Sequence, residues 1–139
     1  MPEGLYFGFD FGCKRIGVAV GQSLTKSASP LATLAAKSGV PNWLELDAVI
    51  KKWRPAGLIV GLPTKIDGQE QYTTVAARKF AQSLAERFSL PVHMVDERLT
   101  TVAARTELYT QGGYRKIQQS QVDSIAACLI LEQWLQDFS

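Results

Sequence analysis

The stretch from Tyr6 to Val20, YFGFDFGCKRIGVAV, belongs to two runs in which apolar side chains alternate with small or polar ones. In the first run the large apolar residues are Leu5, Phe7, Phe9 and Phe11. A period of two is typical of a β-strand with one buried face. The second run, 16–21, alternates in the same way after the short break GCKR. A connection of that length predicts an antiparallel hairpin.

Asp10 is the acidic residue inside this hairpin, and it shares its strand face with Gly8 and Gly12. An unpaired carboxylate in a buried strand is energetically costly, so its presence indicates function rather than packing. Glycines on either side would leave the carboxylate uncovered and allow bulky, charged groups to approach it. We therefore take Asp10 as the first candidate for an active-site residue.

The rest of the chain alternates extended and helical patterns. Residues 27–36 predict a third strand, and Pro30 would place it at an edge of the sheet or delay its start. Pro41 predicts the first turn of an amphipathic helix over 41–53. Further strands are predicted over 56–63 and 90–95, and further helices over 71–88, 100–111 and 120–138. This order predicts one α/β domain over residues 1–139, with a mixed sheet and helices packed on its faces.

The composition is that of a soluble globular protein, with 46% hydrophobic and 20% charged residues among 139. A net charge of +2 is too small to indicate nucleic-acid binding by itself. Cys13 and Cys128 lie far apart without metal-ligand spacing, which predicts free thiols and a cytoplasmic location. No segment has the length and apolar character of a membrane span, and the N-terminus does not resemble a secretory signal.

Two further carboxylates are placed where they could converge with Asp10. Ligands of open α/β sheets bind beyond the carboxyl ends of parallel strands, and Glu97 follows such a strand. Asp96 points to the opposite strand face, and the pattern alone leaves both residues open. Asp123 is predicted in the first turn of the last helix, where the helix dipole favours negative charge. Ser120 to Asp123 also fits a capping box, so Asp123 could serve only as a helix cap.

Clustered carboxylates repel one another unless a cation holds them, and oxygen ligands suit Mg²⁺ or Mn²⁺. Two such ions about 3.5–4 Å apart can activate water and stabilise the leaving oxygen of a phosphodiester. The residues therefore predict a nuclease.

Basic residues flank the acids and could hold phosphates, although isolated surface charges often serve solvation alone. They are Lys14, Arg15, Arg98, Arg115 and Lys116. The lone His93 lies inside a strand and is interpreted as a packed or surface residue.

Four segments in this order resemble the YqgF family of bacterial RNase H-like proteins: FDFGCKRIGVAVG, IVGLPTKIDGQEQ, VDERLTTVAA and GGYRKIQQSQVDSIAACLILEQWL. The resemblance runs from about Leu5 to Leu135. It implies an RNase H-like fold with a five-stranded mixed sheet, in which the first three strands are antiparallel and the others parallel. It also implies a magnesium-dependent nuclease that processes the 5′ end of pre-16S ribosomal RNA, in a family earlier described as Holliday junction resolvases. The partners that the resemblance implies are precursor rRNA, branched DNA and ribosomal particles. Mn²⁺ is the implied substitute for Mg²⁺.

The resemblance also implies roles for individual residues. It assigns Asp10, Glu97 and Asp123 as metal ligands and catalytic residues, and so favours Glu97 over Asp96. The substrate-binding residues would be Lys14, Arg15, Arg98, Thr100, Arg115 and Lys116. The chain departs from the family pattern at Cys13, Lys65, Gln119 and Gln121. The two glutamines replace residues that are often basic in the family, which would either weaken phosphate binding just before Asp123 or shift it to Arg115 and Lys116.

Three alternatives remain beside an rRNA nuclease. The same chemistry could cut four-way DNA junctions, which would need two active sites. The DFGCKRIGVAV motif also resembles the phosphate loop of actin-like ATPases, but those proteins hold ATP between two lobes, and 139 residues build only one. A non-catalytic RNA-binding or transcription-associated module on the same fold is the third alternative.

Overall fold

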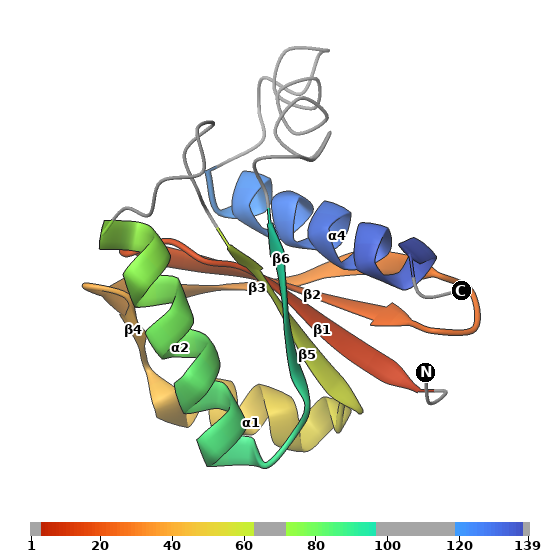
Figure 1. Ribbon diagram of the computed structural model, residues 1–139, viewed down its shortest axis with the longest axis horizontal. Coiled ribbons are helices and arrows are strands. Elements are labelled where there is room, and N and C mark those ends of the chain that lie inside the picture. The colour runs from red at the N-terminus through yellow and green to blue at the C-terminus, as the bar shows by residue number, and fades with distance from the viewer. Residues whose placement is uncertain (1–3, 63–71, 97–118, 138–139) are drawn as a thin grey trace.

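The computed structural model describes residues 4–62, 72–96 and 119–137, which form a twisted six-stranded sheet with helices on both faces (Figure 1). The strand order is β4-β3-β2-β1-β5-β6. The strands are β1 (Leu5–Asp10), β2 (Arg15–Gln22), β3 (Ser27–Lys37), β4 (Val40–Pro41), β5 (Gly57–Leu62) and β6 (Val92–Asp96). The helices are α1 (Trp43–Trp53), α2 (Tyr72–Phe88) and α4 (Gln119–Asp137).

The pairing of the strands confirms the predicted mixed sheet. Strands β1 to β4 pair with one another in antiparallel fashion, whereas β5 runs parallel to β1 and β6 runs parallel to β5. The hairpin predicted from the opening stretch is present, with Asp10 opposite Gly17. The predicted helix over 100–111 lies outside the described residues.

The sequence prediction of five strands was wrong by one, because the two-residue strand β4 pairs with the end of β3. Pro41 belongs to β4 and not to the first turn of α1. Helix α1 begins after Asn42, whose side-chain oxygen accepts hydrogen bonds from the backbone N–H groups of Leu44 and Glu45. Asparagine satisfies the exposed donors of a helix start directly, which moves the boundary two residues past the proline.

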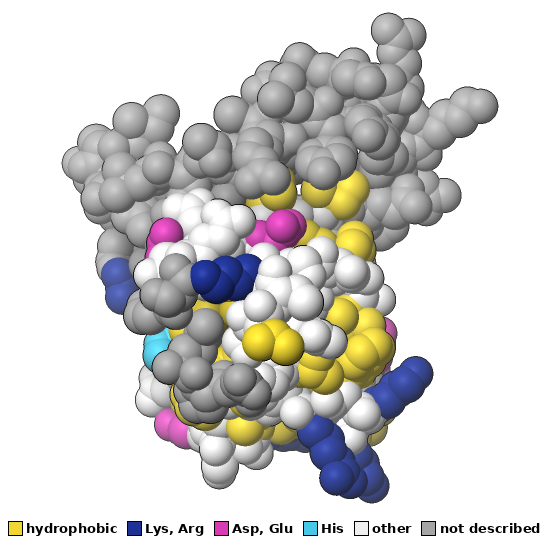
Figure 2. Space-filling view, turned by 90° about the vertical axis from the view of Figure 1, so that its right-hand side faces the viewer, with side chains coloured by type: hydrophobic (Ala, Val, Ile, Leu, Met, Phe, Trp, Pro, Cys, Tyr) yellow, Lys and Arg dark blue, Asp and Glu magenta, His cyan; other side chains and the backbone are white. Residues whose placement is uncertain are grey.

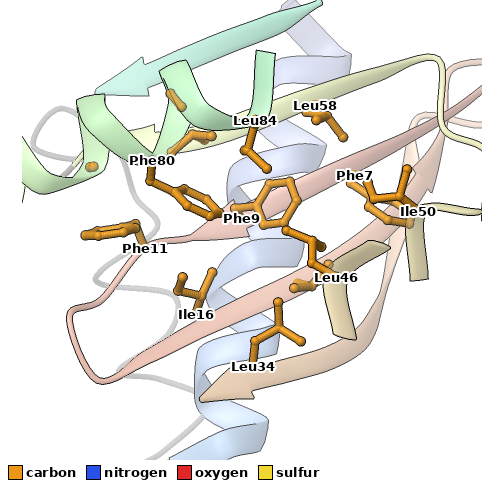
Figure 3. Close-up of a cluster of buried hydrophobic side chains, with 14 residues drawn as sticks. Phe7, Phe9, Phe11, Ile16, Leu34, Leu46, Ile50, Leu58, Phe80 and Leu84 are labelled. Atoms are coloured by element: carbon orange, nitrogen blue, oxygen red, sulfur yellow. The ribbon is translucent and has the colours of Figure 1, made fainter. Parts of the chain in front are cut away.

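The larger hydrophobic core lies between the sheet and the pair α1 and α2 (Figure 3). Phe7 and Phe9 of β1 and Phe11, the residue after β1, point into this layer, as their alternation predicted. Phe80 of α2 packs edge-on against Phe9, with ring centroids 5.5 Å apart. Trp43 of α1 stacks on the same Phe80 ring at 6.0 Å. One face of β1 therefore packs against α1 and α2, and Asp10 lies on the opposite face.

Helix α4 covers the opposite face of the sheet and forms a second core. Its buried residues include Ala127, Leu131 and Trp134, which pack on Tyr6 of β1 and Ala19 of β2. The tryptophan ring lies 5.2 Å from the Tyr6 ring and 5.1 Å from that of His93, between centroids. His93 is thus a surface residue packed on a buried ring, as predicted.

Strand β3 carries Pro30 at a sheet edge, as predicted. Strand β4 pairs only with Ala36 and Lys37, so among the described residues Pro30 has a neighbouring strand on one side alone. The register between β2 and β3 shifts at this point, with Val18 opposite Ala32 and Ala19 opposite Pro30. A proline without an N–H is tolerated where the ladder is interrupted in this way.

Candidate active site

Asp10 is the last residue of β1, on the sheet face that α4 covers. It is partly buried, and β1 is hydrogen-bonded on both sides, to β2 and to β5. The carboxylate is therefore carried by the centre of the sheet, where the backbone is most rigidly held. A central strand end of this kind is a common location for active-site residues in α/β proteins.

Gly8, one of the two glycines predicted to leave Asp10 uncovered, packs against α4 instead, and so does Gly17. A Cβ atom on Gly8 would come within 2.7 Å of the Cβ of Leu131 and 2.9 Å of the carbonyl oxygen of Ala127. A Cβ on Gly17 would overlap the carbonyl group of Asp123. Gly8 and Gly17 therefore let α4 lie directly on β1 and β2. Gly12 lies beside Asp10 in an open cavity.

Asp123 is brought to the same end of the sheet by this close packing. The expected position in the first turn was wrong, because α4 already includes Gln119 and Ser120. A capping role is also not supported, since a helix cap flanks the first turn. The side chain instead accepts a hydrogen bond from Arg15, with 2.9 Å between Nε and Oδ2. The Asp123 side chain is 16% exposed and that of Arg15 is 47% exposed.

Asp10 and Asp123 line one open cavity of about 300 Å³, together with residues 11–15. The turn that forms its rim is fixed by the backbone: the carbonyl oxygens of Cys13 and Lys14 accept hydrogen bonds from Gly39 and Ala36, both 2.9 Å long. Gly12 is needed in this turn, because a Cβ there would lie 2.6 Å from the carbonyl oxygen of Arg15. The cavity thus combines two carboxylates with two basic side chains.

The third predicted acid, Glu97, lies outside the described residues, as do the predicted substrate-binding residues Arg98, Thr100, Arg115 and Lys116. The preference for Glu97 over Asp96 therefore stays a prediction. Lys65, which departs from the family pattern, also lies outside the described residues. Within the ranges 4–62, 72–96 and 119–137, no cluster of three or more His, Cys, Asp or Glu side chains has metal-binding geometry. The described part of the site consists of two acids and two basic residues.

Sequence reasoning missed the role of Gly17 in positioning Asp123. The signal was available, because the hairpin register places Gly17 opposite Asp10, and a glycine in a strand indicates close approach of another backbone. It also missed Cys13 as a residue lining the cavity. Cys13 was predicted as a free thiol and noted as a departure from the family pattern.

A second cavity of about 360 Å³ lies on the other face of the sheet, between α1, α2 and the turn before β4. Trp43 and Phe80 line it. Since Asp10 faces α4, this cavity does not contribute to the candidate site. On the face shown in Figure 2, the basic side chains of the described residues lie in separate places.

The family model described as RuvX, Holliday junction resolvase, matches residues 4–137. A protein of Legionella pneumophila strain Philadelphia 1 is 67% identical over 136 residues, which cover 98% of each chain. One from Actinobacillus pleuropneumoniae serotype 5b is 52% identical over 128 residues, covering 92% of this chain and 93% of the relative. The names of both relatives propose a pre-16S rRNA nuclease.

Two solved structures share the fold at low sequence identity. RuvC of Thermus thermophilus in complex with a Holliday junction substrate has a TM-score of 0.59 at 17% identity, covering 97% of this chain and 95% of that one. The Holliday junction resolvase of fowlpox virus has a TM-score of 0.61 at 10% identity, covering 97% and 99%. These similarities confirm the predicted RNase H-like fold.

Proposed function

The chain belongs to the RuvX family of nucleases, which are hydrolases of phosphodiester bonds, and from this premise we propose that it cleaves nucleic acid with divalent metal ions. The observation that carries the proposal is the shared cavity of Asp10 and Asp123, which come from opposite ends of the chain. Lys14 and Arg15 at its rim supply the positive charge that a polynucleotide backbone requires.

The donor set of the cavity fits Mg²⁺ or Mn²⁺. Carboxylate oxygens are hard ligands, and proteins commonly bind Mg²⁺ through one or two carboxylates and leave its other positions to water and substrate phosphate. Asp10 and Asp123 provide two carboxylates, and Glu97 is the proposed third ligand. When bound, the metal would lower the pKa of an attacking water and stabilise negative charge on the phosphate.

The chain's own residues would orient the substrate. Asp10 keeps its carboxylate at a fixed place because its strand is paired on both sides. Lys14 and Arg15 would bind phosphate oxygens from the rim, each neutralising one backbone charge. Arg98, Thr100, Arg115 and Lys116 are proposed to extend this binding surface.

We propose the 5′ leader of precursor 16S rRNA as the substrate and the cytoplasm as the location. The relatives' names support the substrate. The free thiols of Cys13 and Cys128 suit a reducing compartment. In the described ranges, none of the helices is long and apolar enough to span a membrane. A four-way DNA junction is the second candidate substrate, favoured by the description of the family model.

The test compares cleavage of a precursor 5′-leader RNA, a four-way DNA junction and a linear DNA duplex of the same sequence, each with Mg²⁺ or with EDTA. Asp10→Asn and Asp123→Asn keep the side-chain volume and remove the charge. Asp137→Asn, at the exposed end of α4, is the matched control. We expect wild type and Asp137→Asn to cleave the RNA with Mg²⁺, and the two site variants to lose at least about 100-fold in rate.

The outcomes separate the alternatives. Preferential cutting of the junction would replace the rRNA substrate with branched DNA. Binding of RNA by a protein that leaves all three substrates intact with Mg²⁺ and Mn²⁺ would favour a non-catalytic module. Cleavage that survives Asp10→Asn unchanged would rule out the proposed site.

A further inference from the structure

Arg15 contacts the candidate site in a way that a simple phosphate-binding residue would not. Its Nε donates to Oδ2 of Asp123 at 2.9 Å, across the gap between β2 and α4. The carboxylate is largely buried, so the pair is less screened by water than an ordinary surface ion pair. A charge-assisted hydrogen bond in this setting fixes the orientation of the carboxylate.

The bond uses only part of the guanidinium. Arginine carries five N–H donors in a planar fork, and the bond to Asp123 occupies the one on Nε. In the part of the chain that the structure describes, Asp123 is the one ion-pair partner of Arg15. The side chain is 47% exposed at the rim of the cavity, so its terminal amino groups can meet a ligand from solvent. Two parallel N–H donors match the geometry of a phosphate.

We propose that Arg15 is a positioning residue with two simultaneous contacts: Nε holds the Asp123 carboxylate in its metal-binding orientation, and the terminal amino groups bind a phosphate of the nucleic-acid substrate. The inference rests on the proposed function and deepens it. It links substrate binding to the metal ligand through a single rigid group. Loss of a residue that hydrogen-bonds to a metal ligand commonly weakens metal affinity 10- to 100-fold, and we expect about this effect for loss of Arg15.

Lys14 is the natural control. It carries the same charge, is exposed, and lines the same cavity one residue earlier in the chain. Among the described residues it forms no ion pair with Asp123. An effect that depends only on positive charge near the site should therefore appear equally in variants of Lys14 and Arg15. An effect that depends on the bond to Asp123 should appear only in variants of Arg15.

The experiment measures two equilibria on the full chain. Mn²⁺ affinity is determined by isothermal titration calorimetry without nucleic acid. Binding of a fluorescently labelled 5′-leader RNA is determined by anisotropy in EDTA at several salt concentrations. The proteins are wild type, Arg15→Gln, Arg15→Lys, Lys14→Gln and Asp123→Asn. Circular dichroism and thermal unfolding show whether each variant is folded.

We expect Arg15→Gln to weaken Mn²⁺ binding about 10- to 100-fold and to lower the salt slope of RNA binding by about one. Arg15→Lys retains the charge without the fork, so it should largely keep the salt slope but weaken Mn²⁺ binding. Lys14→Gln should lower the salt slope by about one and leave Mn²⁺ affinity within twofold of wild type.

Three results would overturn the inference. Unchanged Mn²⁺ affinity in a folded Arg15→Gln would show that the bond to Asp123 does not position a ligand. Tighter Mn²⁺ binding in that variant would show that Arg15 competes with the metal for Asp123. An equal loss of Mn²⁺ affinity in Lys14→Gln and Arg15→Gln would show that the effect depends only on positive charge near the site. Failure of the proposed function is distinct, because wild type itself would then bind no Mn²⁺ or bind it no better than Asp123→Asn.

Discussion

The backbone of Gly17 lies directly against the backbone of Asp123, so that a Cβ atom at Gly17 would overlap the Asp123 carbonyl group. Gly17 is also the residue opposite Asp10 in the β1–β2 hairpin. The absence of a side chain at Gly17 therefore determines how closely α4, which carries Asp123, approaches the hairpin that carries Asp10. The spacing of the two acids follows from packing of α4 on the sheet.

Gly17→Ala should displace this end of α4. A methyl group at this position forces a shift of helix backbone and not merely of a flexible side chain, and overpacking of this kind typically costs about 1–3 kcal/mol. We expect a lower urea midpoint and, because Asp123 moves with the helix, weaker Mn²⁺ binding by calorimetry.

Gly21→Ala provides the matched control on the same strand face. Its Cβ would meet the carbonyl oxygen of Ser27 at 2.8 Å and a methyl of Leu131 at 2.9 Å, far along β2 from the acids. It should destabilise the fold yet retain Mn²⁺ affinity. Equal losses of affinity in both variants, or normal affinity in Gly17→Ala, would contradict a specific role of Gly17.

The strands were predictable where burial is one-sided. The alternation that begins in β1 indicated which face packs against α1 and α2, because Phe7, Phe9 and the following Phe11 all lie on that side. Strand β4 was not predictable, since two residues carry no periodic pattern and pair only because a turn returns the chain to β3. The start of α1 was misplaced because Pro41 and Asn42 are both typical of a helix start.

The convergence of Asp10 and Asp123 was predicted from the sequence pattern, and both line one cavity, but the contact between Asp123 and Arg15 was not predicted. Nothing in the pattern near Asp123 indicates that its partner is Arg15 from the first hairpin, since such contacts depend on how α4 crosses the sheet. Gly8 was noticed and then misinterpreted, because a strand pattern does not reveal whether a ligand or a helix fills the space above it.

The two cysteines should differ in reactivity towards a thiol reagent such as dithiobisnitrobenzoate at pH 8. Cys128 is 6% exposed, and burial, with a smaller contribution from Glu132, raises its pKa to about 12. Thiolates are the reactive form, so this residue should be inert in the native protein. Cys13 is half-buried at the cavity rim and accessible.

We therefore expect one thiol to react in native protein and two in urea. In Cys13→Ser, no thiol should react in the native protein, and the single thiol of Cys128 should react in urea. Rapid reaction of both thiols in folded wild type would show that α4 does not cover Cys128 as the second core requires.

Asn42→Ala should destabilise the start of α1 by about 1 kcal/mol, because two backbone N–H groups lose their side-chain acceptor. Asn42→Asp keeps an oxygen in place and adds a charge that the helix dipole favours, so it should retain wild-type stability or exceed it. Urea unfolding followed by circular dichroism measures both. Equal loss in the two variants would assign the effect to another property of Asn42.

The ion pair between α1 and α2 should give stability a specific pH dependence. Arg87 donates to both carboxylate oxygens of Asp47, each at 2.7 Å, and its guanidinium lies 5.2 Å from the Trp43 ring centroid. The hydrogen bond from Arg87 lowers the pKa of Asp47 below its ordinary value of 3.8. A carboxyl whose pKa is lower in the folded state contributes stability above the unfolded pKa, and this stability is lost as pH falls through the folded pKa.

Asp47→Asn should therefore lower the Tm at pH 7, and the difference from wild type should shrink as the pH falls below about 4. The drop should be small because the pair is exposed to solvent. Glu86→Gln is the control, since Glu86 accepts a hydrogen bond from the neutral Gln82 of the same helix. Differential scanning calorimetry of the three proteins from pH 7 to pH 3 makes the comparison. A Tm difference for Asp47→Asn that persists undiminished at pH 3 would show that the ion pair is not its source.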